Sequence, residues 1–213
     1  MTDKPKFESK IIDIRDARVA FLRAHEAVAR TGKDGKPKGK PKYSATYLLD
    51  PSNVDHAKQI VEIKKEAFRA AVWLFGEDKS KWPKNAGGAP LYYCFGLGND
   101  LPSLGAKIYD GFADMFYLKV SDTARPSLRN RAGKTVVEGD PEVPYSGCYV
   151  NGKVTFYAYD NESKGVGANF RSMQFVRDGK AFGGGGRGAE DEYAALAGDA
   201  KGAQPVDEAD PWA

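Results

Sequence analysis

The strongest constraint on the fold is the alternation of side chains from Cys148 to Tyr159. One set is small or apolar: Cys148, Val150, Gly152, Val154, Phe156 and Ala158. The other set is polar or aromatic: Tyr149, Asn151, Lys153, Thr155, Tyr157 and Tyr159. Successive side chains of a strand point to opposite faces of a sheet. The stretch therefore predicts a strand with one core face and one outward face that carries three tyrosines and a lysine.

Further strands are expected on both sides of this one. Residues 115–121 place Phe116, Leu118 and Val120 on one face, with Tyr117 and Lys119 on the other. Residues 17–23 alternate with Val19 and Phe21 on one face, and residues 42–49 are rich in strand-forming types. Residues 166–177 form a further strand, and 160–165 form the hairpin turn before it.

One helix interrupts the strands. Ser52 is the expected N-cap, with Asp55 completing a short capping box. Apolar residues then recur at helical spacing until Gly76, a natural stop: Ile60, Ile63, Ala67, Ala71 and Leu74. Short strands around one long helix predict a mainly β fold, an OB-fold-like five-stranded barrel with loop extensions. A β-sandwich remains an alternative. We assign this domain to residues 17–182, after a flexible segment 1–16.

Charge is divided unevenly along the chain. The net charge is +3, but residues 189–213 carry seven acids against Lys201, which gives them −6 and leaves +9 for residues 1–188. Gly183–Gly186 begins a glycine-rich linker, and 183–213 is expected to be a disordered acidic tail, with a short helix possible over 190–196. Within the basic part, residues 30–42 form an expected loop, because their glycines and prolines oppose regular structure.

Outward rings mixed with cations suit single-stranded nucleic acid, because exposed bases stack on rings and phosphates meet Lys or Arg. Stacking ignores base identity, so binding should depend little on sequence. Tyrosine also favours strands for packing reasons alone, which is the competing interpretation. The candidate DNA-binding residues on the strands are Tyr43, Tyr47, Tyr117, Lys119, Tyr149, Lys153, Tyr157, Tyr159 and Arg171. The candidates in basic segments are Lys36, Lys38, Lys40, Lys42, Arg125, Arg129 and Arg131.

Motifs of enzymes and metal sites are lacking in the sequence. The two cysteines, Cys94 and Cys148, stand far in sequence from each other and from His25 and His56, whereas structural zinc sites show close pairs. The segment from Gly35 to Pro41 departs from a P-loop in spacing and has proline where Ser or Thr would hold magnesium. We expect no cofactor and no metal. Scattered carboxylates leave a metal-dependent nuclease as the alternative function.

Three segments, 42–51, 144–160 and 165–179, resemble a family of bacteriophage single-stranded DNA-binding proteins. The resemblance covers roughly residues 15–185. It implies an OB fold, no enzymatic activity and a role in phage DNA replication, recombination or repair, in the cytoplasm of the infected host cell. A strand-annealing protein would look similar. The sequence shows no membrane segment, and a monomer and a homodimer are both compatible with it.

The acidic tail predicts a docking element for a partner protein. Its candidate residues are Asp207, Glu208, Asp210, Pro211 and Trp212. The ring suits a pocket and the acids suit a basic rim, and the same acids can compete with DNA for the basic body. The tail resembles the acidic, aromatic-ended tips of other single-strand binders, which recruit replication proteins such as a polymerase or helicase. It departs from them in having Trp212 followed by Ala213.

Overall fold

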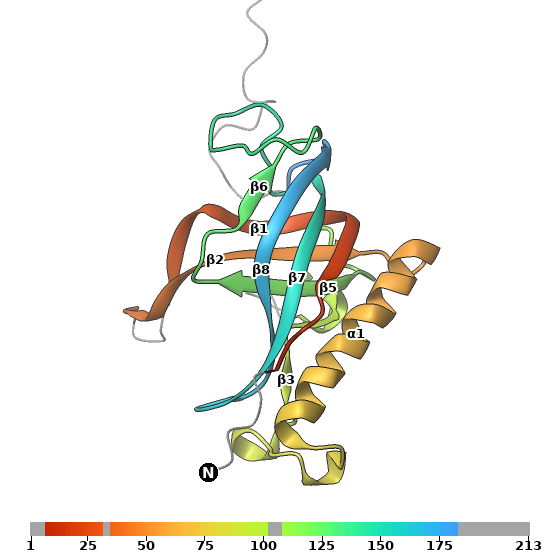
Figure 1. The fold of residues 1–213 in the computed structure, drawn as a ribbon, viewed down its shortest axis with the longest axis vertical. Helices are drawn as coiled ribbons and strands as arrows, with labels where there is room; N and C mark the ends of the chain where they lie inside the picture. The colour runs from red at the N-terminus through yellow and green to blue at the C-terminus, as the bar shows by residue number, and fades with distance from the viewer. Residues whose placement is uncertain (1–6, 32–34, 102–107, 183–213) are drawn as a thin grey trace, which may run out of the picture. The chain divides into compact units, whose positions relative to one another are not determined.

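The structure, a computed structural model, describes residues 7–31, 35–101 and 108–182. Five long strands dominate it (Figure 1): β1 Ile12–Thr31, β2 Pro37–Leu49, β5 Phe116–Asp122, β7 Tyr149–Asp160 and β8 Lys164–Arg177. The short strands are β3 Tyr92–Tyr93, β4 Phe95–Leu97 and β6 Ser127–Arg129. The helices are α1 Val54–Phe75 and the 3-10 turns Lys79–Lys81, Ala86–Gly88 and Gly98–Asp100. The prediction of a mainly β fold with one long helix is confirmed.

The long strands close into a barrel. β1 pairs with both β2 and β7, β2 pairs with β5, and β7 pairs with β8, all antiparallel. The gap between β8 and β5 is bridged by the segment around Cys94. Its amide donates to the Val166 carbonyl at 3.0 Å, and its carbonyl accepts from the Lys119 amide at 2.7 Å. Five long strands joined in this order form the OB-like barrel that the sequence predicts.

The N-terminal segment is more ordered than the sequence suggests. β1 begins at Ile12, so the prediction of a flexible segment through residue 16 is wrong for residues 12–16. Upstream of the strand, the Ser9 hydroxyl and the Lys10 amide donate to Glu66 on α1 at 3.0 and 2.8 Å. Burial alone opposes ionisation of Glu66, but hydrogen bonds from Arg69, Lys10 and Ser9 outweigh it and lower the pKa of this carboxyl.

The predicted basic loop 30–42 is largely an extension of the β1–β2 hairpin. Thr31 pairs with Pro37, and Val28 pairs with Lys42, with register shifts between them. Gly39 has a φ of +80°, which glycine adopts without steric cost. Proline is tolerated at the edge of a two-stranded ribbon, where its missing N–H needs no partner. The prolines and glycines therefore shape the hairpin instead of breaking it.

The N-cap of α1 lies one residue later than predicted. Asn53, not Ser52, caps α1, and its side-chain oxygen accepts from the amides of Asp55 and His56. Ser52 instead donates to Asp50. Gly76 ends the helix as predicted. Ile60, Ile63, Ala67 and Ala71 are buried against the barrel, so α1 covers one side of it (Figure 1).

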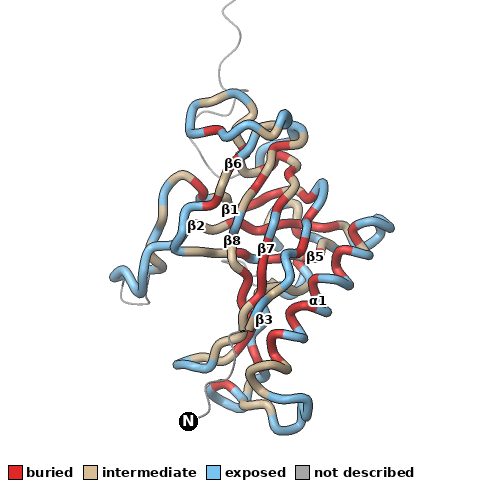
Figure 2. Tube along the Cα trace, in the orientation of Figure 1, coloured by how far each residue is buried: buried red, intermediate tan, exposed pale blue. Residues whose placement is uncertain are grey.

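The core lies inside the barrel and beneath α1. In Figure 2, buried residues follow the barrel strands and the helix face that meets them, while the end of the β1–β2 hairpin is exposed. Tyr47 belongs to this core and is 0% exposed, because it shares a face of β2 with Ala45 and Leu49. Its assignment as a DNA-binding residue is therefore wrong. Among the described residues, no helix combines the length and apolar composition needed to cross a bilayer.

Candidate nucleic-acid interface

An open groove of about 860 Å³ runs across the outer face of the barrel. β2 and β5 contribute its polar floor, and the β1–β2 and β7–β8 hairpins contribute flanking residues. The flanking hairpins approach each other outside the groove, where Lys38 forms an exposed ion pair with Glu162 at 3.8 Å. In OB folds, oligonucleotides bind over the second and third strands, between the loop after strand 1 and the loop after strand 4. The groove has this position.

Two tyrosines of β7 form an aromatic surface in the groove. Tyr157 pairs with Gly167 across the β7–β8 ladder, and Tyr159 pairs with Gly165. A side chain at Gly167 would overlap the Tyr157 ring, and one at Gly165 would overlap the Tyr92 backbone and the Tyr159 hydroxyl, so the glycines let the tyrosines lie over β8. Burial raises the pKa of both tyrosines, so the rings are uncharged at neutral pH. They can meet a base without repelling its phosphate.

Three cations accompany these rings. Arg23, Lys42 and Lys119 line the groove, and no Asp or Glu is among the described residues that do so. The two other large pockets among the described residues differ, because carboxylates line both. Asp13 lies in each of them, beside Arg129 and Lys153 in one and beside Glu62 in the other. Of these three pockets, the groove alone has a lining that combines aromatic rings with cations and includes no carboxylate among the described residues.

The remaining predicted tyrosines do not line the groove. Tyr149 lies near the opposite end of β7, and the Arg177 guanidinium stacks on its ring at 3.3 Å from the centroid. Tyr117 lies beside Lys119 but packs over Gly96 and against a second small apolar cluster around Phe112. Tyr43 is half-buried against the core. The predicted alternation of β7 holds except at Thr155, which is buried, and its outward residues are spread along too long a strand to form one site.

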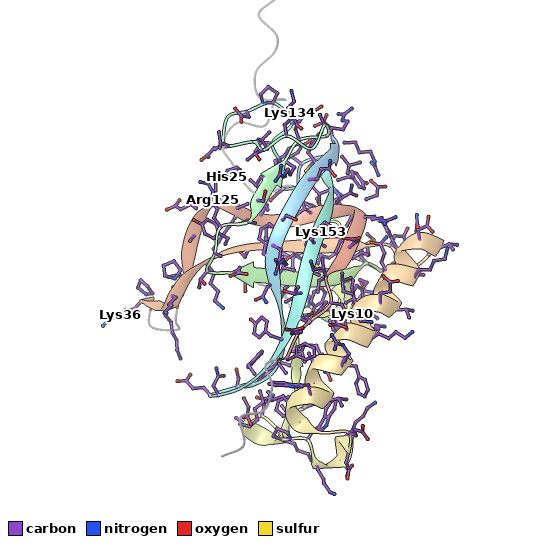
Figure 3. All side chains as sticks on the ribbon, in the orientation of Figure 1. Lys10, His25, Lys36, Arg125, Lys134 and Lys153 are labelled. Carbon is purple, nitrogen blue, oxygen red and sulfur yellow. The ribbon has the colours of Figure 1, made fainter. Side chains whose placement is uncertain are left out.

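The predicted cations are scattered over the barrel surface. Lys36, Arg125 and Lys153, labelled in Figure 3, come from three separate parts of the structure. Lys153 is paired with Asp13 at 2.6 Å.

Other predicted cations have contacts of their own or lie outside the groove. Arg131 pairs with Glu142, and Arg129 donates to the Gly133 carbonyl. Lys40 and Arg171 are exposed and lie outside the groove lining. Of the cations selected from sequence, the structure brings Lys42 and Lys119 into the groove.

Several groove residues were missed by sequence reasoning. Tyr92 and Tyr93 lie on β3 and are 52% and 38% exposed. Nothing in the glycine- and proline-rich run 76–114 marks them as part of a sheet. Phe21 and Arg23 of β1 also line the groove. The position of Arg23 could have been predicted from the paired strand β2, where the polar residues Lys42 and Ser44 indicate an outward face.

No group of three or more His, Cys, Asp or Glu side chains within residues 7–31, 35–101 and 108–182 is placed to hold a metal ion. His56 has a structural contact, since its Nδ1 accepts from the Asp50 amide at 3.0 Å. Burial raises the pKa of the Cys94 thiol to about 12 and that of Cys148 to about 11, so both are protonated at neutral pH.

Comparison with known proteins places the chain in a family. Residues 10–203 match the profile of the family described as the single-stranded DNA-binding protein of Enterobacter phage Enc34. The chain belongs to this family. The chain is also similar to "Putative protein p50" of Acyrthosiphon pisum secondary endosymbiont phage 1. It is 36% identical over 185 residues, which span 85% of this chain and 91% of that protein.

Solved structures of the Enc34 protein share the fold. Its complex with single-stranded DNA superposes with a TM-score of 0.61 at 21% identity, covering 81% of this chain and 89% of that one. A second structure of the Enc34 protein superposes with a TM-score of 0.57 at 19% identity, covering 85% of this chain and 88% of that one. Membership of the Enc34-type family confirms the resemblance to phage single-strand binders and the prediction of a non-enzymatic protein. The tail residues Asp207, Glu208, Asp210, Pro211 and Trp212 lie outside the described residues.

Proposed function

We propose that the groove binds single-stranded DNA without sequence preference. The observation that supports this most is the lining itself: tyrosine rings and three cations with no carboxylate among the described lining residues. Tyr157 and Tyr159, with Tyr92 and Tyr93, offer ring faces to unpaired bases. Arg23, Lys42 and Lys119 attract the phosphates. In a duplex the base faces are already stacked on one another, so the rings favour a single strand.

Titration of fluorescent oligo(dT) with the full chain tests this proposal. We expect tight binding at low salt and weaker binding to a duplex of the same length. Three phosphate contacts should make the logarithm of the binding constant fall with log salt at a slope of about −2. The labelled strand should stay uncut with Mg²⁺. Equal affinity for duplex DNA, or binding that ignores salt, would contradict the groove chemistry.

We further propose that the protein acts in phage DNA replication, recombination or repair inside the infected host cell, and protects the strands that these processes expose. The acidic segment with Trp212 would recruit replication proteins such as a polymerase or helicase. Its charge of −6 next to a basic body supports an electrostatic role. The same charge competes with DNA for the groove cations.

Removing residues 200–213 separates these roles. We expect oligo(dT) affinity to be equal or higher, because three acids are lost with one lysine, which removes a net charge of −2. Trp212→Ala leaves the charge intact and serves as the matched variant, which should lose partner binding alone in a pull-down with the replication proteins of the host and phage. If the truncated chain binds DNA more weakly, the competition between tail and DNA does not exist.

A further inference from the structure

Phe21 is exposed where the strand pattern would bury it. Val19, two residues earlier, is fully buried in the core, so a regular strand would place Phe21 beside it. Instead Phe21 is 49% exposed and lines the groove. The sequence-based expectation that Val19 and Phe21 share a face is therefore wrong.

A β-bulge turns Phe21 outward. Ala20 pairs with Thr46 and Arg23 with Ser44, so Phe21 and Leu22 together lie opposite Ala45 alone. Phe21 has a φ of +51°, in the left-handed region that glycine normally occupies at the first position of such bulges. A bulky residue in this conformation is an outlier, and such outliers gather at functional sites. Glycine at position 21 would relieve this backbone strain, yet the sequence has phenylalanine there.

The ring is partly open to the groove. Phe21 meets Tyr109 nearly perpendicularly, at 5.2 Å between centroids and 79° between planes, and meets Phe112 at 5.6 Å and 45°. Despite these two contacts the side chain stays about half exposed and lines the groove. Two cations line the same groove: Arg23, two residues further along β1, and Lys42 on β2. Phe21 therefore adds a ring to a groove that already combines rings with cations.

We propose that Phe21 is a stacking platform for an unpaired base, presented by the bulge on the β1 side of the groove. The inference rests on the proposed binding of single-stranded DNA and adds a contact residue from a strand that neither the sequence nor the tyrosine pattern indicated. The competing role is structural, in which Phe21 only completes the apolar cluster with Tyr109 and Phe112.

Phe21→Leu and Phe21→Gly distinguish the two roles. Leucine keeps apolar contact but has no ring face, so Phe21→Leu should bind oligo(dT) about tenfold more weakly, as expected for one lost base stack. Phe21→Gly should lose at least as much affinity, yet its midpoint of urea unfolding should equal or exceed that of the wild type, because glycine adopts this φ without strain. Phe21→Tyr should bind like the wild type.

Phe68→Ala is the matched control, since Phe68 is an exposed phenylalanine on α1 that does not line the groove. It should leave DNA affinity unchanged. If Phe21→Leu binds like the wild type in an assay where the wild type binds, this inference is overturned and the proposed function stands. Large losses of stability in Phe21→Gly with unchanged affinity in Phe21→Leu would establish the structural role. A wild-type chain that fails to bind oligo(dT) refutes both proposals.

Discussion

Tyr157→Ala weakens binding of oligo(dT) about tenfold, and the double variant Tyr157→Ala, Tyr159→Ala weakens it about a hundredfold. Each ring that stacks on a base contributes roughly 1–3 kcal/mol, so one lost ring corresponds to about one power of ten or more. Both rings are half-exposed and lie over glycines of β8, so their removal leaves the barrel core unchanged. The fold should therefore survive, as circular dichroism and thermal unfolding would show.

Tyr149→Ala is the matched control for this experiment. Tyr149 lies on the same strand and the same face, but Arg177 covers its ring and it does not line the groove. Its removal should cost about 1 kcal/mol of stability through the lost cation–π contact, with DNA affinity unchanged. If Tyr149→Ala reduces affinity as much as Tyr157→Ala, the DNA path follows the whole length of β7 and the groove is not the principal site.

Gly152→Ala destabilises the folded protein by about 3 kcal/mol. The added methyl group would overlap the ring and hydroxyl of Tyr47, which is fully buried in the core. Overpacking of a well-packed core costs roughly 1–3 kcal/mol, and the upper end applies where the neighbour cannot move. Urea unfolding measures the change. A variant as stable as the wild type would mean that the Tyr47 ring is not packed on Gly152.

Gly167→Ala is the informative comparison, because its methyl group would overlap Tyr157 to a similar degree. Tyr157 is half-exposed and can swing outward, so less than about 1 kcal/mol of stability should be lost. DNA affinity should fall instead, since the displaced ring leaves the groove. Two glycines of the sheet that each contact a tyrosine thus have different expected effects: Gly152→Ala on folding and Gly167→Ala on binding.

Tyr47→Phe provides a rescue of Gly152→Ala. The Tyr47 hydroxyl is buried without a hydrogen-bond partner among the described residues. Burial raises the pKa of this hydroxyl well above its usual range, so it stays a neutral group. Removing an unsatisfied buried hydroxyl should add about 1 kcal/mol of stability and relieve part of the overlap with alanine 152. Oligo(dT) affinity should not change, in keeping with the core position of Tyr47.

Much of the site was within reach of sequence reasoning, and the misses have identifiable causes. On β2, Lys42, Ser44 and Thr46 form a polar face, so the alternate residue Tyr47 had to face the core. The alternation of polar residues along β2 was therefore enough to place Tyr47 in the core. The position of Tyr92 had none, because its role depends on a short segment that bridges β8 and β5 through the backbone of Cys94. Because this bridge is made by backbone groups, the pattern of side chains in the sequence gives little indication of it.

The sequence by itself determined the strands, the single helix, the excess of positive charge in the body and the outward face of β7, because these follow from periodicity and composition within short segments. The tertiary structure decided which outward residues meet. Barrel closure brings Lys42, Lys119 and Tyr157 from three strands into one groove, while it carries Tyr149 and Lys153 elsewhere. It also decided the direction of Phe21, since a bulge exists only when two strands are paired and one has a residue too many.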